Sequence, residues 1–196
     1  MLFRSPSFAK IEGLMQFDLF HIFTVDEHIL RVIKNLRLFG SEEYKNKYPI
    51  CYSLIKTIPK LELLYLAGLF HDIAKGRKGN HSQPGSKDAF NFCEQHGLST
   101  YDTKLVEWLV KNHLLMSKTS QRNDLDDPDV ISDFSKIIGD QTHLNYLYLL
   151  TVADICATNP EIWNSWKASL LATLYHETLR HFRRGSEKPL LKTERI

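Results

Sequence analysis

Apolar residues recur at intervals of three and four positions along most of the chain, from Phe17 to about Gly185. This spacing is typical of amphipathic helices, whereas the strict alternation that marks a half-buried strand is nearly absent. Capping residues, glycines and prolines interrupt the pattern at intervals that suit helices of ordinary length. The pattern therefore predicts an all-α protein, a helical bundle of about seven or eight helices.

Local start and stop signals set the expected helix boundaries. Thr24 and Glu27 form a capping-box pattern before a helix that we expect to end at Gly40 in the left-handed conformation. Asp127 and Asp140 are N-cap signals for two later helices. The expected helical ranges are 24–39, 60–74, 82–96 ending at Gly97, 100–116, a short helix after Asp127, 140–157, and a long helix from Asn159-Pro160 to about Gly185.

The helical pattern weakens at both ends of the chain. Residues 1–16 hold no convincing element, and residues 186–196 are polar with Pro189 inside them. We therefore expect one domain over residues 17–185, an N-terminal segment over 1–16 and a C-terminal linker over 186–196, all cut from a longer chain. With 196 residues, 43% of them hydrophobic, the domain can bury a core without disulfides.

Composition and charge narrow the classes of protein. Lysine and arginine number 25 against 23 acidic residues, a net charge of +2 that is too balanced for a general nucleic-acid binder or a polybasic membrane anchor. There is no apolar run long enough for a membrane span and no secretory signal pattern. Cys51, Cys93 and Cys156 form no CxxC pair. We expect a cytoplasmic protein with no nucleic-acid or membrane partner.

A candidate for chemistry is the pair His71-Asp72, which interrupts an otherwise apolar helix near its C-terminal end. Burying both side chains without partners would cost free energy, and one shared cation would satisfy both. The pair alone also fits a hydrogen-bonded core histidine beside an aspartate at a helix end. Further residues in helical, apolar or adjoining loop contexts favour the metal: His28, His81, His113 and Asp154.

The order His, then His-Asp, then a distal Asp resembles the HD phosphohydrolase superfamily. The resemblance implies an HD-domain helical bundle and a first divalent ion. The implied ligands of this ion are His28, His71, Asp72 and Asp154. It also implies that Asp72 bridges to a second ion held by His81 and His113. We expect one or two ions, Mn or Mg first, with Fe, Co or Zn as alternatives for a mixed imidazole and carboxylate site.

The expected chemistry is phosphoester hydrolysis, because a divalent ion lowers the pKa of a water molecule and neutralises charge on phosphoryl oxygens. Asp72 and Lys75 are the candidate catalytic residues, and Lys75 lies close enough in sequence to reach a phosphate oxygen. Arg77 and Lys78 can add positive potential, or form an ordinary solvated loop. In the polar segment 117–124, expected to be a loop, Arg122 is a candidate phosphate or base contact.

Trp163 and Trp166 follow the distal aspartate by about one connection. A tryptophan can stack on a nucleobase. Two tryptophans three positions apart on an amphipathic helix are more often part of the core, and packing is the interpretation we favour.

Several longer phrases are more specific than the superfamily pattern. They are FDLFHIFTVDEH at 17–28, LFHDIAKG at 69–76, NHLLMS at 112–117, TVADI at 151–155 and WNSWK at 163–167. Together they are similar to the HD domain of the bacterial bifunctional uridylyltransferase/uridylyl-removing enzymes. In that family a nucleotidyltransferase domain attaches UMP to a tyrosine of the PII nitrogen-regulatory protein, the HD domain removes it, and ACT domains sense glutamine.

The closer resemblance implies a metal-dependent phosphodiesterase that releases UMP from uridylylated PII. It also implies nucleotidyltransferase and ACT domains in the full-length chain, and the sequence signatures of these domains do not occur here. Two alternatives stay open from the sequence: an HD phosphohydrolase of free or cyclic nucleotides, and a non-catalytic HD signalling domain.

Overall fold

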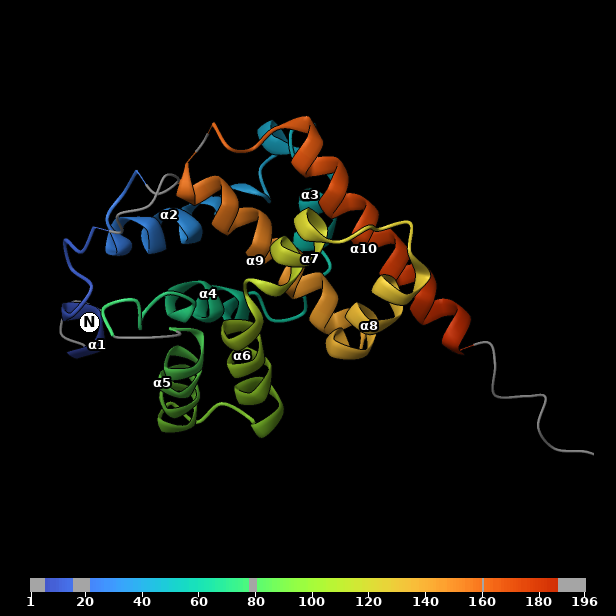
Figure 1. Cartoon of the computed structure of the whole chain (residues 1–196). Coiled ribbons are helices and arrows are strands. Elements are labelled where there is room, and N and C mark those ends of the chain that lie inside the picture. Colours follow the sequence, from blue (N-terminus) through green and yellow to red (C-terminus); the bar gives the residue numbers. More distant parts are fainter. Residues whose placement is uncertain (1–5, 16–21, 78–80, 160, 187–196) are drawn as a thin grey trace, which may run out of the picture.

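The computed structural model describes residues 6–15, 22–77, 81–159 and 161–186 (Figure 1). This part of the chain holds ten α-helices, a 3-10 helix and one isolated bridge between Met15 and Thr24. The elements are α1 (Pro6–Ala9), α2 (Val25–Leu38), η2 (Glu42–Tyr44), α3 (Pro49–Ile55), α4 (Leu61–Phe70), α5 (Ser82–Gln95), α6 (Thr100–Asn112), α7 (Leu115–Arg122), α8 (Pro128–Ile138), α9 (Gln141–Thr158) and α10 (Ser165–Ser186). The all-α prediction is confirmed. Within the described ranges, no helix combines the length and the apolarity that crossing a membrane requires.

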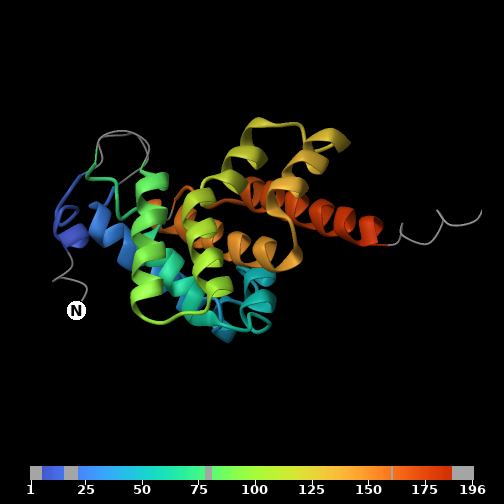
Figure 2. The same ribbon diagram turned by 90° about the horizontal axis from the view of Figure 1, so that it is seen from below.

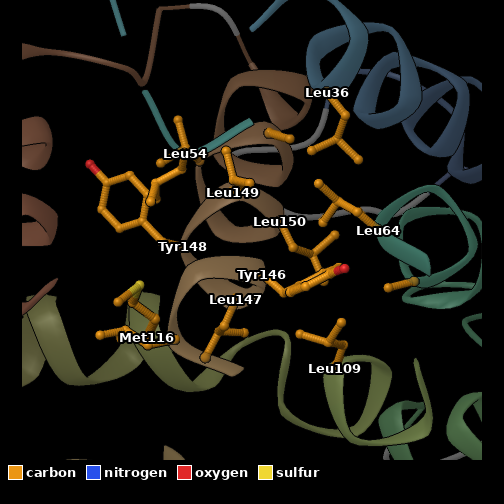
Figure 3. Close-up of a cluster of buried hydrophobic side chains, with 14 of the residues drawn as sticks. Leu36, Leu54, Leu64, Leu109, Met116, Tyr146, Leu147, Tyr148, Leu149 and Leu150 are labelled. Carbon is orange, nitrogen blue, oxygen red and sulfur yellow. The ribbon is translucent and has the colours of Figure 1, made fainter. Parts of the chain in front are cut away.

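Helix α9 is the centre of the bundle. It is apolar on every side, with an unbroken buried run from Tyr146 to Ala153, as expected for a helix surrounded by others. Helices α2, α3, α4 and α10 all pack against it. Figure 3 shows its side chains meeting Leu64, Leu109 and Met116 of the neighbouring helices. An aspartate on this helix therefore lies close to the middle of the molecule.

Helix α4 lies between α2 and the pair α5–α6, which run side by side (Figures 1 and 2). Gly68 makes the approach of α4 to α2 possible, since a Cβ there would lie 3.0 Å from Ile33 Cδ1 and 3.3 Å from Val32 Cγ1. Gly85 brings α5 to the end of α4, because its Cβ would lie 3.3 Å from the Phe70 carbonyl oxygen. These two glycines thus allow α2, α4 and α5 to pack closely near the C-terminal end of α4.

Several expected helix ends are confirmed. The Asp127 and Asp140 carboxylates accept hydrogen bonds from the backbone N–H groups of Asp129 and His143, and Gly97 has a φ of 72°. Three others are wrong. The helix expected over 60–74 ends at Phe70. The Thr24 side chain makes no capping hydrogen bond, and Gly40 is not left-handed, since α2 ends through Phe39 in the right-handed region.

The prediction of one helix over 100–116 is wrong, and so is the loop over 117–124. Helix α6 ends at Asn112, and the polar segment forms α7, which buries Met116 and Ser120. The His113 ring explains the break. Its Nδ1 donates to the Val110 carbonyl oxygen at 2.7 Å, a group that would otherwise accept from the backbone four residues on.

Helix α10 begins later than expected. Asn164 Oδ1 accepts from the Lys167 N–H, so the helix starts at Ser165 and not at Asn159, which ends α9. Pro160 lies outside the described residues. The sequence pattern also predicted neither α1 nor α3.

Residues 6–15 pack onto the body of the domain. Phe8 and Ile11 are fully buried, in a small cluster with Ile29, Ile73 and Ala74. The backbone of this segment touches the turn that follows α4, since a Cβ on Gly76 would lie 2.8 Å from the Lys10 carbonyl oxygen. This segment therefore lies against the turn that carries the His-Asp pair.

Replacing Gly76 with alanine should lower the free energy of unfolding by about 1–3 kcal/mol, because the new methyl group would press on backbone that cannot rotate away. Gly40→Ala is the matched control, since its Cβ would find no atom closer than 3.8 Å, and it should stay within about 0.5 kcal/mol of wild type. Urea unfolding measures both. Equal stability of the two variants would show that residues 6–15 do not pack on the turn.

Candidate metal centre

His28 and Asp154 meet where α2 crosses α9. His28 Nε2 lies 3.0 Å from Asp154 Oδ1, with the histidine buried and the aspartate 17% exposed. About two turns along the same face of α2, Asn35 Nδ2 donates to the Ala153 carbonyl oxygen at 3.0 Å. Asn35 thus ties the two helices together beside Asp154. Sequence analysis missed this residue, although its spacing of seven from His28 places it on the same helix face.

His71 and Asp72 occupy the turn that ends α4. The His71 Nδ1 donates to the Gly68 carbonyl oxygen at 2.7 Å, as His113 does at the end of α6, and the helix stops at Phe70. The chain then continues as hydrogen-bonded turns, with the Lys75 N–H bonded to the Asp72 carbonyl oxygen. Both side chains of the pair are buried and point to one place, where His71 Nε2 lies 3.2 Å from Asp72 Oδ2.

His81 and His113 complete the cluster from α5 and α6. His81 precedes the first turn of α5, and its Nε2 lies 3.2 Å from Asp72 Oδ1. His113 follows the last residue of α6, and its Nε2 lies 3.7 Å from the same oxygen. All six sequence-predicted ligands therefore come together, from five separate segments of the chain.

The ligand atoms form two groups that could each hold a metal ion. One contains His28, His71 and Asp154, and the other contains Asp72, His81 and His113. Asp72 also faces the first group, since its Oδ2 lies 3.2 Å from His71 Nε2 and 3.4 Å from His28 Nε2. Ligand atoms at about 2.1 Å from one ion lie about 3.0 Å apart at right angles and about 3.4 Å apart in a tetrahedron, so these spacings suit a shared ion.

The hydrogen bonding of the histidines also suits a metal. A carbonyl oxygen only accepts, so His71 and His113 carry their protons on Nδ1 when neutral and turn the Nε2 lone pair toward the cluster. Asp72 Oδ1 and the Nε2 atoms of His81 and His113 are buried, and none makes a hydrogen bond of normal geometry within the described residues. Lone pairs that converge without a donor are satisfied by a cation.

The charges of the cluster favour a cation at the same place. Burial opposes a charge on His71, but Asp72 and Asp154 together outweigh it and raise the pKa of His71. Burial and the nearby His71 lower the pKa of His113 to about 4, so its Nε2 is unprotonated at neutral pH. For Asp72, burial is outweighed by His71, His81 and Lys75, which hold its pKa well below the usual range. The carboxylates stay ionised and attract positive charge.

Comparison with known proteins agrees with this arrangement. Residues 25–159 match the HD domain family. This chain belongs to the HD-domain family. All six ligand candidates fall within the matched range.

Several proteins that are similar to this chain carry the same name. The chain is 59% identical over 191 residues to the bifunctional uridylyltransferase/uridylyl-removing enzyme of Pseudomonas aeruginosa, and 58% identical to the enzymes of that name from Stutzerimonas stutzeri and Azotobacter vinelandii. Each match covers 97% of this chain but 21% of the relative. This chain thus spans about a fifth of the length of these relatives.

Among the basic residues that are candidates for binding phosphate, Lys75 lies at the cluster. Its Nζ is 2.7 Å from Asp72 Oδ2, and its side chain is 11% exposed. Arg77 is engaged elsewhere, because its guanidinium pairs with Asp88 and donates to Ser7 Oγ at 3.2 Å. Lys78 lies outside the described residues. Of the two candidates that the structure describes, Lys75 and not Arg77 is at the cluster.

Arg122 and Trp166 are exposed, and Trp163 packs against another part of the domain. Arg122 is the exposed last residue of α7, seven residues and about 10 Å of helix beyond Leu115. Trp163 packs against the Tyr48 ring at 5.6 Å between centroids, as the packing interpretation expects. Trp166 is 60% exposed, so its side chain is not part of the core.

Removing His113 should lower the number of metal ions bound by the HD domain from two to one, since the group of His28, His71 and Asp154 stays complete. Mass-spectrometric metal analysis of His113→Ala after loading with Mn measures this. His176→Ala removes an exposed histidine outside the cluster and should bind as wild type does. Identical metal content in His113→Ala and wild type would contradict a second site.

Proposed function

We propose that this chain is the uridylyl-removing part of a bifunctional nitrogen-regulatory enzyme, and that it hydrolyses the uridylyl-tyrosine phosphodiester on the PII protein in the cytoplasm to release UMP. The observation that carries the proposal is the position of Asp72, whose two carboxylate oxygens face two different groups of ligands. Membership of the HD family and the 59% identity to bifunctional enzymes support it. Nucleotidyltransferase and ACT domains would belong to the rest of the full-length chain.

The residues of the cluster would hold two divalent ions, Mn or Mg, with Asp72 between them. Such ions lower the pKa of a water molecule and neutralise the charge that develops on phosphoryl oxygens. His71 and His113 keep their Nε2 lone pairs directed by hydrogen bonds to carbonyl oxygens, so the ligands need no rearrangement. Asp154 and His81 are the more exposed members, at 17% and 22%, and the phosphate would approach from their side.

Lys75 would bind the phosphate. Its ammonium contacts Asp72 Oδ2 and remains partly exposed, so it can donate a hydrogen bond to a non-bridging phosphoryl oxygen without leaving the carboxylate. This positive charge would stabilise the transition state more than the substrate, because charge accumulates on those oxygens during the reaction.

The bond between phosphorus and the tyrosine oxygen is the one expected to break. Water adds to phosphorus, UMP keeps the new oxygen, and the electron pair of the broken bond goes to the tyrosine oxygen. A phenol has a pKa of about 10, far below that of a sugar hydroxyl, so the tyrosine leaves without a strong general acid. The proton that water loses restores the phenol through solvent, and the products are UMP and unmodified PII.

Turnover of uridylylated PII against a panel of UMP, cyclic nucleotides and nucleoside triphosphates tests the proposal with the Mn-loaded chain. Release of UMP from PII, at a rate above that for every member of the panel, is expected. Hydrolysis confined to the panel would favour a hydrolase of free or cyclic nucleotides. Metal binding without turnover of any substrate would favour a non-catalytic signalling domain.

The Asp72→Asn variant should lose hydrolysis of uridylylated PII by at least about a thousandfold, since an amide cannot supply two anionic oxygens to the two groups of ligands. Circular dichroism should give helical content near that of wild type, because Asp72 lies outside α4. Turnover equal to that of wild type would remove Asp72 from the reaction.

The Lys75→Ala variant should slow the reaction by about ten- to a thousandfold, the range that follows the loss of one charged donor to the phosphoryl group. Metal content should stay at the wild-type level, because Lys75 is not among the ligand atoms of either group. Loss of bound metal in this variant would mean that Lys75 positions Asp72 and does not bind phosphate.

A further inference from the structure

A pocket lies where α2, the segment 44–48 and the end of α9 meet. Its volume is about 190 Å³. Three aromatic residues line it: Phe39, Tyr44 and Tyr48. Among the described residues, its lining includes three cationic side chains and no carboxylate; the three are Arg31, Lys34 and Lys47.

The pocket adjoins the metal centre through both helices that form it. Arg31 and Lys34 lie about 5 and 9 Å along the axis of α2 from His28. On α9, the lining residue Cys156 follows Asp154 by two positions. Asn35, which also lines the pocket, is the residue that ties α2 to α9 through the Ala153 carbonyl oxygen. A molecule whose phosphate lies at the metal centre can therefore reach this pocket with a group roughly 5–10 Å away.

The positive charge in the pocket is largely uncompensated. The charge of Arg31 is balanced in part by that of Glu27, since Arg31 Nε lies 2.8 Å from Glu27 Oε1. Lys34 and Lys47 are exposed, and neither forms an ion pair with a described residue. The Nζ of Lys47 lies 5.3 Å from the Tyr48 ring, which weakly favours the cation but does not neutralise it.

Some cations elsewhere on the surface have carboxylate partners. Lys60, Lys136 and Arg180 each have a carboxylate partner within 2.8 Å. The chain as a whole is nearly neutral, with 25 basic and 23 acidic residues. The pocket brings three cations from two separate segments together, and the part of its lining that the structure describes holds no carboxylate. Such a pocket is complementary to an anion.

We propose that this pocket is a subsite for an acidic side chain of the uridylylated protein, close to the modified tyrosine. The inference rests on the proposed function. The charge of the scissile phosphate would be met by the metal centre and Lys75, and the uridine that it carries is neutral. A second anionic group must then come from the polypeptide, so the pocket selects UMP attached to a protein over small diesters.

The double variant Lys34→Glu/Lys47→Glu tests the subsite, because both side chains are exposed and their replacement leaves the core intact. Hydrolysis is measured on uridylylated PII and on the p-nitrophenyl ester of UMP, which offers the same phosphate and nucleoside without a protein. The preference for the protein, expressed as the ratio of the two kcat/KM values, should fall at least tenfold through a higher KM. Lys104→Glu, on the exposed face of α6, is the matched control and should keep the wild-type ratio.

Ionic strength gives a second readout that a structural effect would not produce. The preference of wild type for the protein should decline between about 50 and 300 mM salt, while the low preference of the double variant stays flat. A double variant with the wild-type ratio, or one that loses activity equally on both substrates, overturns the subsite and leaves the proposed function standing. Wild type that cleaves the ester but not uridylylated PII overturns both.

Discussion

The buried carboxylate of Asp72 is the constraint around which this structure is organised. An ionised carboxylate that is 2% exposed costs several kcal/mol unless positive charge and hydrogen-bond donors surround it. The surrounding groups come from α2, the turn after α4, the start of α5 and the end of α6, with Asp154 of α9 beside them. Because neutral His71 and His113 direct their Nε2 lone pairs to this position, a metal ion could complete the arrangement.

Helix termination and metal binding are linked in this fold. His71 and His113 each stop a helix by donating from Nδ1 to the carbonyl oxygen three residues back, and each thereby directs Nε2 into the cluster. The helices themselves are held by an apolar α9 and by close contacts at Gly68 and Gly85, so the ligands rest on rigid elements. The same crossing of α2 and α9 that brings His28 to Asp154 also forms the cationic pocket.

Local signals predicted well what depends on local structure. The caps at Asp127 and Asp140 and the left-handed Gly97 follow from side chains and backbone within four residues. The break at His113 was missed, because a histidine is not a usual stop signal and its ring competes for a backbone carbonyl. The types of ligand could be recognised from sequence, and their order resembled a family. Their convergence, and the engagement of Arg77 by Asp88, depend on how distant helices cross, which no local pattern encodes.

The central claim is that Asp72 lies between two metal ions, each completed by its own group of side chains. Anomalous diffraction from crystals of the Mn-loaded protein, collected on both sides of the Mn absorption edge, tests it most directly. The account predicts two peaks about 3.5–4 Å apart, one beside His28, His71 and Asp154 and the other beside His81 and His113, with one Asp72 oxygen directed to each. A cluster without an anomalous peak, or with Asp72 turned away from both ions, would contradict it.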